Sequence, residues 1–345
     1  MKLSEFDFEL PQDLIAQTPA RCRDHSRMMV VRRDTGKWEH LHFRDLPQII
    51  GREHFLVMNN TRVFPARLGA CRPNRQEHIE VLLVRDLGAG DWLALLKPGR
   101  KAIIGQELRI GPLCAEVKEI RESGARVLHF PEPENLMAVF ETIGHTPLPP
   151  YIHRLPGQDL ADDNTRYQTV YARHIGSVAA PTAGLHFTEE ILHRLDQTGV
   201  PRCEILLHIG YGTFQPVRCK KIENHHMEPE YFEVSENAAA SISKYKQEGR
   251  RLIAVGTTTA RVLEYLALGE EGFCGGKSGF CDLFIYPGFK YRMLDGLLTN
   301  FHLPQSTLFM LVCAFGGYKL LQECYREAVR QQYRFYSYGD CMLLL

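Results

Sequence analysis

Three histidines lie in short loops rich in small residues, and their side chains could carry acid–base chemistry. His186 lies in SVAAPTAGLHFT, His208 in HIGYGTFQPV and His302 in TNFHLPQST. Histidine is the usual general base at neutral pH because its ordinary pKa is close to 6.5. A lone histidine is more often structural than catalytic, but three in loops of one composition favour a shared site. We take all three as candidate catalytic residues, and the loop sequences do not indicate which of them is the base.

The same loops carry glycines and threonines where helices are expected to begin; Thr188, for example, is the expected N-cap of a helix. A helix start presents free backbone N–H groups and the positive end of the helix dipole, so it favours a carboxylate or phosphate. Glycine lets a ligand approach the backbone closely. Threonines at such a position are also typical of capping, and capping is compatible with ligand contact. The candidate binding residues of these loops are Thr182, Gly184, Gly210, Gly212, Thr213, Gly256, Thr257, Thr258 and Asn300.

Basic residues form clusters although the formal net charge is zero, with 41 Lys plus Arg against 41 Asp plus Glu. This balance argues against indiscriminate binding of polyanions, but a local basic face can still bind nucleic acid. The candidate nucleic-acid contacts are Lys97, Arg100, Lys101 and Arg334. The segment around Arg334 also predicts a helix with an aromatic core face, which the pattern alone favours. Arg62 and Arg67 would ordinarily be solvated or paired, but together they could bind a phosphate or carboxylate.

Several familiar sites are absent from the sequence. The ten cysteines are scattered without a CxxC pair, and no HExxH or zinc spacing occurs, so we expect no metal. No GxGxxG or GxSxG motif is present, and no apolar run has the length of a membrane span. Scattered cysteines without an export signal are typical of a cytosolic protein with reduced thiols.

The pattern of expected secondary structure changes twice along the 345 residues. From residue 61 to about residue 130, short strands separated by turns predict a small barrel or sandwich. A Pro-rich linker follows, and after residue 151 strands alternate with helices. We therefore predict an α/β fold with a mainly parallel sheet flanked by helices and an inserted small all-β barrel domain. Residues 1–60 and 151–345 are expected to form the α/β catalytic domain and residues 61–150 the inserted domain.

Ten or so separated segments resemble one known family. They include AAPTAGLHFT, LHIGYGTFQPV, VGTTTARVLE, LLTNFHLPQSTLFMLVCAFGG and YRFYSYGDCMLLL, with VMNNTRVFPARL and RYQTVYA earlier in their order. Together they resemble the S-adenosylmethionine:tRNA ribosyltransferase-isomerases of queuosine biosynthesis over essentially the whole chain. Many motifs at the right spacing are far more specific than any single one.

The resemblance implies an activity and its partners. The family transfers and isomerises the ribosyl part of S-adenosylmethionine onto 7-aminomethyl-7-deazaguanine at the wobble position of a tRNA with a GUN anticodon, giving epoxyqueuosine, adenine and methionine. It implies a cytoplasmic enzyme with S-adenosylmethionine as cosubstrate, no metal, no membrane and no obligatory protein partner. Arg62, Arg67 and Tyr167, which lie in matching segments, become second-tier substrate contacts.

The sequence departs from the family pattern at two positions. Glu228 stands where a histidine is usual, so no histidine role carries over there, and Cys281 replaces a usual threonine. Two other functions stay open on the residues alone, an S-adenosylmethionine-dependent RNA methyltransferase and a non-catalytic tRNA-binding module. The missing glycine-rich loop counts against the first, and the histidine-bearing loops count against the second.

Overall fold

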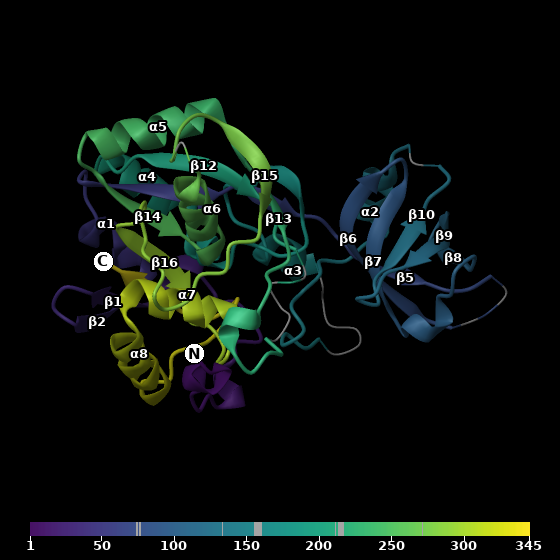
Figure 1. The fold of residues 1–345 in the computed structure, drawn as a ribbon, viewed down its shortest axis with the longest axis horizontal. Coiled ribbons are helices and arrows are strands. Elements are labelled where there is room, and N and C mark those ends of the chain that lie inside the picture. Colours follow the sequence, from purple (N-terminus) through teal and green to yellow (C-terminus); the bar gives the residue numbers. More distant parts are fainter. Residues whose placement is uncertain are drawn as a thin grey trace.

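The computed structural model contains two bodies of different architecture (Figure 1). It describes residues 1–345 except residues 74, 76, 133, 155–160, 211, 213–216 and 271. A nine-stranded sheet covered by helices forms the larger body, and a six-stranded antiparallel sheet forms the smaller one. The prediction of an α/β fold with a separate all-β part is confirmed at this level.

The large sheet is mixed, whereas the sequence predicted a mainly parallel one. Its strands, in spatial order, are β15 (Lys277–Cys281), β13 (Glu230–Val234), β12 (Arg202–Leu207), β3 (His54–Asn59), β14 (Arg251–Val255), β16 (Gly296–Asn300), β17 (Cys341–Leu344), β1 (Arg27–Arg32) and β2 (Lys37–His42). The four central strands β12, β3, β14 and β16 are parallel. Strand β17 runs antiparallel to β16 and parallel to β1, while β2, β13 and β15 pair antiparallel at the two edges.

Side chains of the central strands alternate between two apolar layers, as the two-residue period of a strand requires. In β3, Phe55 and Val57 belong to one cluster and Leu56 and Met58 to the other. The first layer packs against α5 (Glu236–Gln247), α6 (Thr257–Leu268), α7 (Thr307–Gly316) and α8 (Tyr318–Arg330). The second packs against α1 (Leu46–Ile49) and α4 (Glu189–Gln197). Helices on both faces leave the strand ends as the accessible edge.

Helices begin where the sequence supplies caps. Thr188 accepts a 3.2 Å hydrogen bond from the Ile191 backbone N–H at the start of α4, which confirms the predicted N-cap. Ser306 caps α7 in the same way. Helix α6 instead starts from Gly256, whose φ of 91° other residues rarely adopt.

The six-stranded sheet is nearly closed into a barrel, on the right in Figure 1. Its strands, in spatial order, are β5 (Arg67–Ala70), β6 (Ile79–Gly88), β7 (Asp91–Lys97), β10 (Arg126–His129), β9 (Leu113–Ile120) and β8 (Glu107–Ile110). A bridge between Cys71 and Arg109 links its two edges. Helix α2 (Leu136–Ile143) packs on this barrel, where Phe140 contacts Trp92 edge-on within a separate apolar cluster.

A small parallel sheet connects the two bodies. Strand β4 (Thr61–Val63) leads from the large sheet toward the barrel and pairs with β11 (His174–Ser177) on the returning chain. The returning chain also carries the short helix α3 (Ala161–Arg166) and the 3-10 helix η6 (Thr182–His186). None of the helices in the described part of the chain combines the length and the apolarity that a bilayer span requires.

Candidate active site

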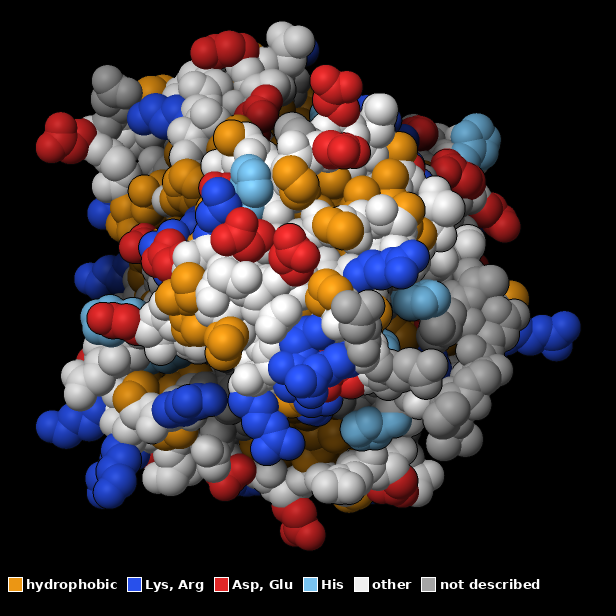
Figure 2. Space-filling view, turned by 90° about the vertical axis from the view of Figure 1, so that its right-hand side faces the viewer, with side chains coloured by type: hydrophobic (Ala, Val, Ile, Leu, Met, Phe, Trp, Pro, Cys, Tyr) orange, Lys and Arg blue, Asp and Glu red, His pale blue; other side chains and the backbone are white. Residues whose placement is uncertain are grey.

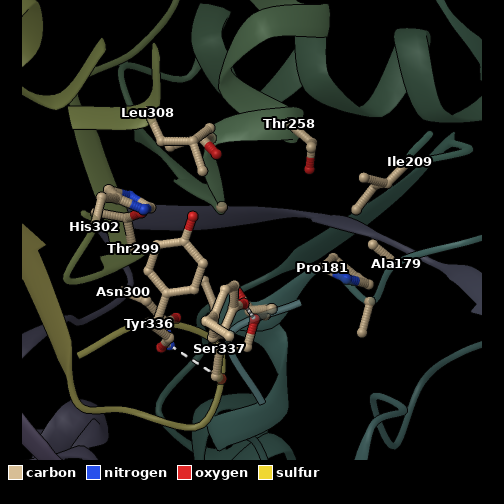
Figure 3. A pocket seen from close by; sticks show the side chains of 16 residues that line it. Ala179, Pro181, Ile209, Thr258, Thr299, Asn300, His302, Leu308, Tyr336 and Ser337 are labelled. Atoms are coloured by element: carbon tan, nitrogen blue, oxygen red, sulfur yellow. Dashed lines mark hydrogen bonds between the residues drawn. The ribbon is translucent and has the colours of Figure 1, made fainter. Parts of the chain in front are cut away.

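The first cavity lies at the carboxyl ends of β14 and β16, where open α/β sheets usually bind ligands. It has a volume of about 50 Å³ and opens below the starts of α6 and α7 (Figure 3). Its walls come from η6, α6, the end of β16 and the segment before β17. The predicted site residues among its lining are Thr182, Gly256, Thr257, Thr258, Asn300 and His302.

His302 is a buried histidine held by its neighbours in this cavity. Its Nε2 lies 2.8 Å from the Thr299 hydroxyl, and its backbone N–H donates to the Tyr325 hydroxyl at 3.1 Å. Burial lowers the pKa of His302 to about 3, so the imidazole is neutral at physiological pH. It can therefore exchange hydrogen bonds with a ligand without bringing a charge into the cavity.

The second cavity is much larger, about 690 Å³, and lies between the barrel and the large sheet. The barrel contributes Trp92 and Met137, among others, and the α/β body contributes Tyr231 and Phe280. His208, Gly210 and Gly212 all line it. Ile209 lines both cavities, so the two spaces adjoin at the chain segment that follows β12.

His208 is oriented by three contacts at the edge of the second cavity. Its Nδ1 lies 2.9 Å from the Thr61 hydroxyl, and its ring stacks on Tyr231 with centroids 6.0 Å apart. A Cβ on Gly176 would come within 2.6 Å of the His208 ring, so only glycine leaves room for it. Burial, followed by the neighbouring His174, lowers the pKa of His208.

His186 lines neither of these cavities and lies behind the first one. It is buried at the end of η6, with its ring 5.3 Å from that of Phe43. Burial lowers the pKa of His186 to about 4, against an opposing effect of the Asn300 side chain. Its Nε2 has no hydrogen-bond partner within the described part of the chain. His186 thus stands next to a wall of the cavity rather than in it.

The remaining predicted contacts occupy varied surroundings. Gly184 lines neither cavity, and a Cβ there would lie 2.1 Å from the Tyr171 hydroxyl oxygen. Tyr167 is fully buried beside Tyr338, and desolvation raises the pKa of its phenol. Arg62 is exposed on β4. Arg67 donates to the Leu148 carbonyl at 3.0 Å. Thr213 lies outside the described residues.

Known proteins resemble this chain along its whole length. The family model described as "Queuosine biosynthesis protein" matches residues 3–344. The S-adenosylmethionine:tRNA ribosyltransferase-isomerases of Desulfitobacterium hafniense and Desulforamulus reducens are 48% and 46% identical to it, with all of both chains covered. The crystal structure of an S-adenosylmethionine tRNA ribosyltransferase from Thermotoga maritima is 38% identical, with a TM-score of 0.58 over 99% of this chain and 100% of that one. The chain belongs to the queuosine biosynthesis protein family.

The two departures from the family pattern lie at or near the second cavity. Glu228 lines it, beside Gly212. Cys281 is buried, and its carbonyl accepts a hydrogen bond from Arg261. Arg261 also forms a buried ion pair of 3.0 Å with Glu230, whose other oxygen accepts the Gly210 N–H at 2.9 Å. The Arg261–Glu230 ion pair therefore holds the Gly210 backbone in place.

The predicted tRNA contacts divide into exposed and structural residues. Lys97 and Arg100 are exposed at one end of the barrel, and Lys101 pairs with Glu77 at 3.0 Å. Figure 2 looks onto the barrel side, where basic side chains gather near the middle of a face of mixed charge. Arg334 is half-buried and donates to the Thr18 carbonyl. The predicted helix does not extend this far, because α8 ends at Arg330, before Arg334. The neighbours Tyr333, Phe335 and Tyr338 are nevertheless buried, as an aromatic core face requires, whereas Tyr336 is half-buried and lines the first cavity.

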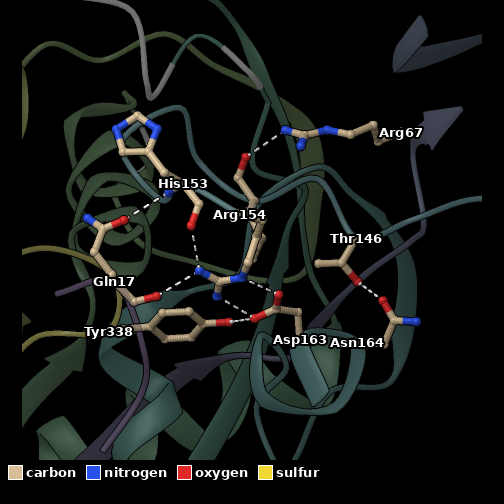
Figure 4. Close-up of polar contacts among 9 residues, drawn as sticks. Gln17, Arg67, Thr146, His153, Arg154, Asp163, Asn164 and Tyr338 are labelled. Atoms are coloured by element: carbon tan, nitrogen blue, oxygen red, sulfur yellow. Dashed lines mark hydrogen bonds and ion pairs between the residues drawn. The ribbon is translucent and has the colours of Figure 1, made fainter. Parts of the chain in front are cut away.

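The segment that returns from the barrel is fastened by a polar network (Figure 4). Arg154 makes a two-pronged ion pair with the buried carboxylate of Asp163, with both distances 2.7 Å. Asp163 also accepts from the Tyr338 hydroxyl at 3.1 Å, and Arg154 donates to the Gln17 carbonyl at 2.8 Å. The network joins this segment to the N-terminal part of the chain through Gln17 and to its C-terminal part through Tyr338.

Sequence reasoning missed several residues that line the first cavity. Tyr151 comes from the end of the Pro-rich linker, Ile209 from the segment after β12, and Tyr336 and Ser337 from the segment before β17. The aromatic segment that contains Tyr336 was noted for RNA binding, for core packing and for its resemblance to the family, but not as a wall of a cavity. No group of three or more His, Cys, Asp or Glu side chains suited to a metal occurs within the described residues.

Proposed function

We propose that this protein transfers and isomerises the ribosyl part of S-adenosylmethionine onto 7-aminomethyl-7-deazaguanine in the wobble position of a tRNA, releasing adenine and methionine and leaving epoxyqueuosine. The observation that carries the proposal is the pair of cavities that adjoin at Ile209. A reaction between a small cosubstrate and a nucleotide of a large RNA needs two such spaces with a common boundary.

The first cavity is the site proposed for S-adenosylmethionine. The first turn of α6 begins at its wall, and Gly256, Thr257 and Thr258 all line it. The free N–H groups of this turn and the positive end of the helix dipole suit the methionine carboxylate. Thr182 supplies a further polar contact, and Asn300 lines another wall, where its side-chain amide donates to the Tyr336 and Ser337 carbonyls.

The second cavity is the site proposed for the deazaguanine nucleotide. It is wide enough for a base, and Trp92, Tyr231 and Phe280 offer flat apolar surfaces. Gly210 and Gly212 allow close approach of a ligand to the backbone. The carboxylate of Glu228 lines the same space and has the charge to attract an aminomethyl cation.

The histidines fall into different proposed roles. The sulfonium acidifies the neighbouring C5′, so a base can remove a proton there. Adenine then leaves, the amine of the modified base adds, and ring closure expels methionine.

His208 and His302 line the cavities and are the proposed proton-transfer groups. His186 lines neither, and we assign it to positioning the first cavity's wall. Arg62, Arg67 and Tyr167 stay predicted substrate contacts, ranked below the residues that line the cavities.

The partner and setting follow from the same proposal. A tRNA with a GUN anticodon would lie across the barrel side, with Lys97, Arg100 and Lys101 near its phosphates and Arg334 further inside. We infer a cytoplasmic enzyme that uses no metal and no obligatory protein partner. Residues 61–150 are proposed as a domain inserted between residues 1–60 and 151–345, which the barrel's separate apolar cluster supports.

The deciding experiment is incubation with S-adenosylmethionine and a tRNA that carries the aminomethyl base, with chromatography of the small products. We expect adenine and methionine in equal amounts. Release of S-adenosylhomocysteine would instead indicate a methyltransferase, and a gel shift without consumption of cosubstrate would indicate a binding module. Alanine at His208 or His302 should reduce adenine release by about 100-fold or more, as expected for loss of a general acid or base.

A further inference from the structure

Tyr336 has a backbone conformation that is unusual for a bulky residue. Its φ is 76°, in the left-handed region, where the Cβ of an aromatic residue meets the adjacent backbone. Such strain persists only where the surroundings impose it, and it is concentrated at ligand sites. The question is what holds Tyr336 there and what the conformation achieves.

Three hydrogen bonds impose the strained conformation. The Tyr336 N–H donates to the Phe301 carbonyl at 2.9 Å. Its carbonyl accepts from the Asn300 side-chain amide at 2.8 Å and from the Gly339 N–H at 3.0 Å. The Asn300 amide also reaches the Ser337 carbonyl at 3.3 Å. Asn300 and Phe301 lie at the end of β16, so the sheet itself fixes the Tyr336 backbone.

The conformation places the Tyr336 ring inside the first cavity. Figure 3 shows the ring standing up from the segment below, with its hydroxyl toward the side of Leu308 and Thr258. Tyr151 packs perpendicular to it, with centroids 3.7 Å apart and planes at 85°, and bonds Ser337 through its hydroxyl. A braced aromatic ring therefore faces the polar helix starts across the cavity.

We propose that Tyr336 stacks on the adenine ring of S-adenosylmethionine and that Asn300 positions it; this inference rests on the proposed function. The helix starts suit the carboxylate end of the cosubstrate, which leaves the flat nucleobase for the aromatic wall. Tyr336 thus contacts the group that departs, and a ring held in place loses little freedom when the ligand arrives.

The test is equilibrium binding of S-adenosylmethionine and S-adenosylhomocysteine, measured by calorimetry without tRNA. Loss of one base–aromatic stack weakens binding by about 10-fold or more. We expect Tyr336→Ala to weaken both ligands by a similar factor, because both carry adenine, and to leave binding of free methionine unchanged. Tyr336→Phe keeps the ring and should bind both ligands like the wild type.

Two glycine variants separate the effect of the strained backbone on binding from the effect of losing the Tyr336 ring. Tyr336→Gly relieves the strained φ and removes the ring, so it should remain folded and yet bind both ligands weakly. Gln332 is exposed and has a φ of 54°, so Gln332→Gly is the matched control that relieves strain outside the cavity. It should bind like the wild type.

Asn300→Ala should weaken both ligands, and combining it with Tyr336→Ala should add less than the sum of the two effects, because Asn300 is proposed to act through the ring. Full additivity, or unchanged affinity in Tyr336→Ala, would overturn the inference. A loss confined to S-adenosylmethionine would overturn it in favour of a contact with the sulfonium. If the wild type binds neither ligand, the proposed function itself fails.

Discussion

The two cavities meet at Ile209 but are built in opposite ways. The first is small, and its walls are fixed by hydrogen bonds between strand ends, helix starts and the Tyr336 segment. The second is more than ten times larger and has one wall from the barrel and one from the large sheet. Polar helix starts that face a fixed aromatic ring suit the charged and flat parts of a cosubstrate, whereas a wide space between two bodies suits a nucleotide that arrives attached to a tRNA.

The largest expected effect separates the cavities at Gly176. Gly176→Ala would place a Cβ 2.6 Å from the His208 ring, so the ring must move. A displacement of this kind at a reacting group costs about 100-fold in rate. We expect adenine release to fall by that factor while calorimetric binding of S-adenosylmethionine stays unchanged. Gly249→Ala, with a φ of 78° and no atom within 4 Å of the added Cβ, controls for backbone strain. A parallel loss of cosubstrate binding would mean that the cavities are not separate.

A smaller effect is expected at the first cavity from Gly256→Ala. The φ of 91° is strained for alanine, so the start of α6 should shift. We expect S-adenosylmethionine affinity to fall about 10-fold, the effect of one misplaced polar contact, with tRNA affinity unchanged. Gly317 has a φ of 89° and precedes α8 outside both cavities, so Gly317→Ala is the matched control. Equal affinities in the two variants would contradict the placement of the cosubstrate.

The buried histidines predict a pH dependence of stability. The pKa is lowered to about 4 for His186 and about 3 for His302, so the unfolded chain binds protons near pH 6.5 that the folded chain does not. The contribution of these neutral imidazoles to the free energy of unfolding is complete above pH 6.5, and it declines as the pH falls toward 4. The slope is about 1.4 kcal/mol per pH unit for each histidine. Urea unfolding at pH 7.5 and pH 5.5 should show a larger loss for the wild type than for a His186→Gln, His302→Gln variant. Equal losses would show that these imidazoles titrate normally.

The smallest effect is expected from Arg67, which lies outside both cavities. It pairs with Glu80 at 3.2 Å, with both side chains about 40% exposed, and such pairs contribute little. Arg67→Ala should lower the free energy of unfolding by less than about 1 kcal/mol and leave S-adenosylmethionine binding unchanged. A 10-fold loss of affinity would support its predicted role as a substrate contact.

Patterns with a clear local cause were predictable from the sequence. The cap at Thr188 and the short strands of the barrel follow from residue type and period. The mixed order of the large sheet was not, because β17 inserts between β16 and β1 through contacts far apart in the chain. No local signal states which distant strand will be a neighbour.

The candidate site was predictable in part for the same reason. Loops at strand ends indicated where His302 and Thr258 would meet, since parallel strands end at one edge. They could not show that His186 would lie behind a wall, or that Tyr336 would enter the cavity. Both depend on the path of the segment before β17, which the end of β16 fixes through Asn300.

Strand β17 also imposes an order of events on folding. The six paired strands of the barrel lie between residues 67 and 129, so that sheet can form while the rest of the chain is still being synthesised. The large sheet has a gap between β16 and β1 until residues 341–344 leave the ribosome. The first cavity, which needs the segment just before β17, therefore depends on this late pairing. A nascent chain is expected to hold a finished barrel beside an incomplete α/β body.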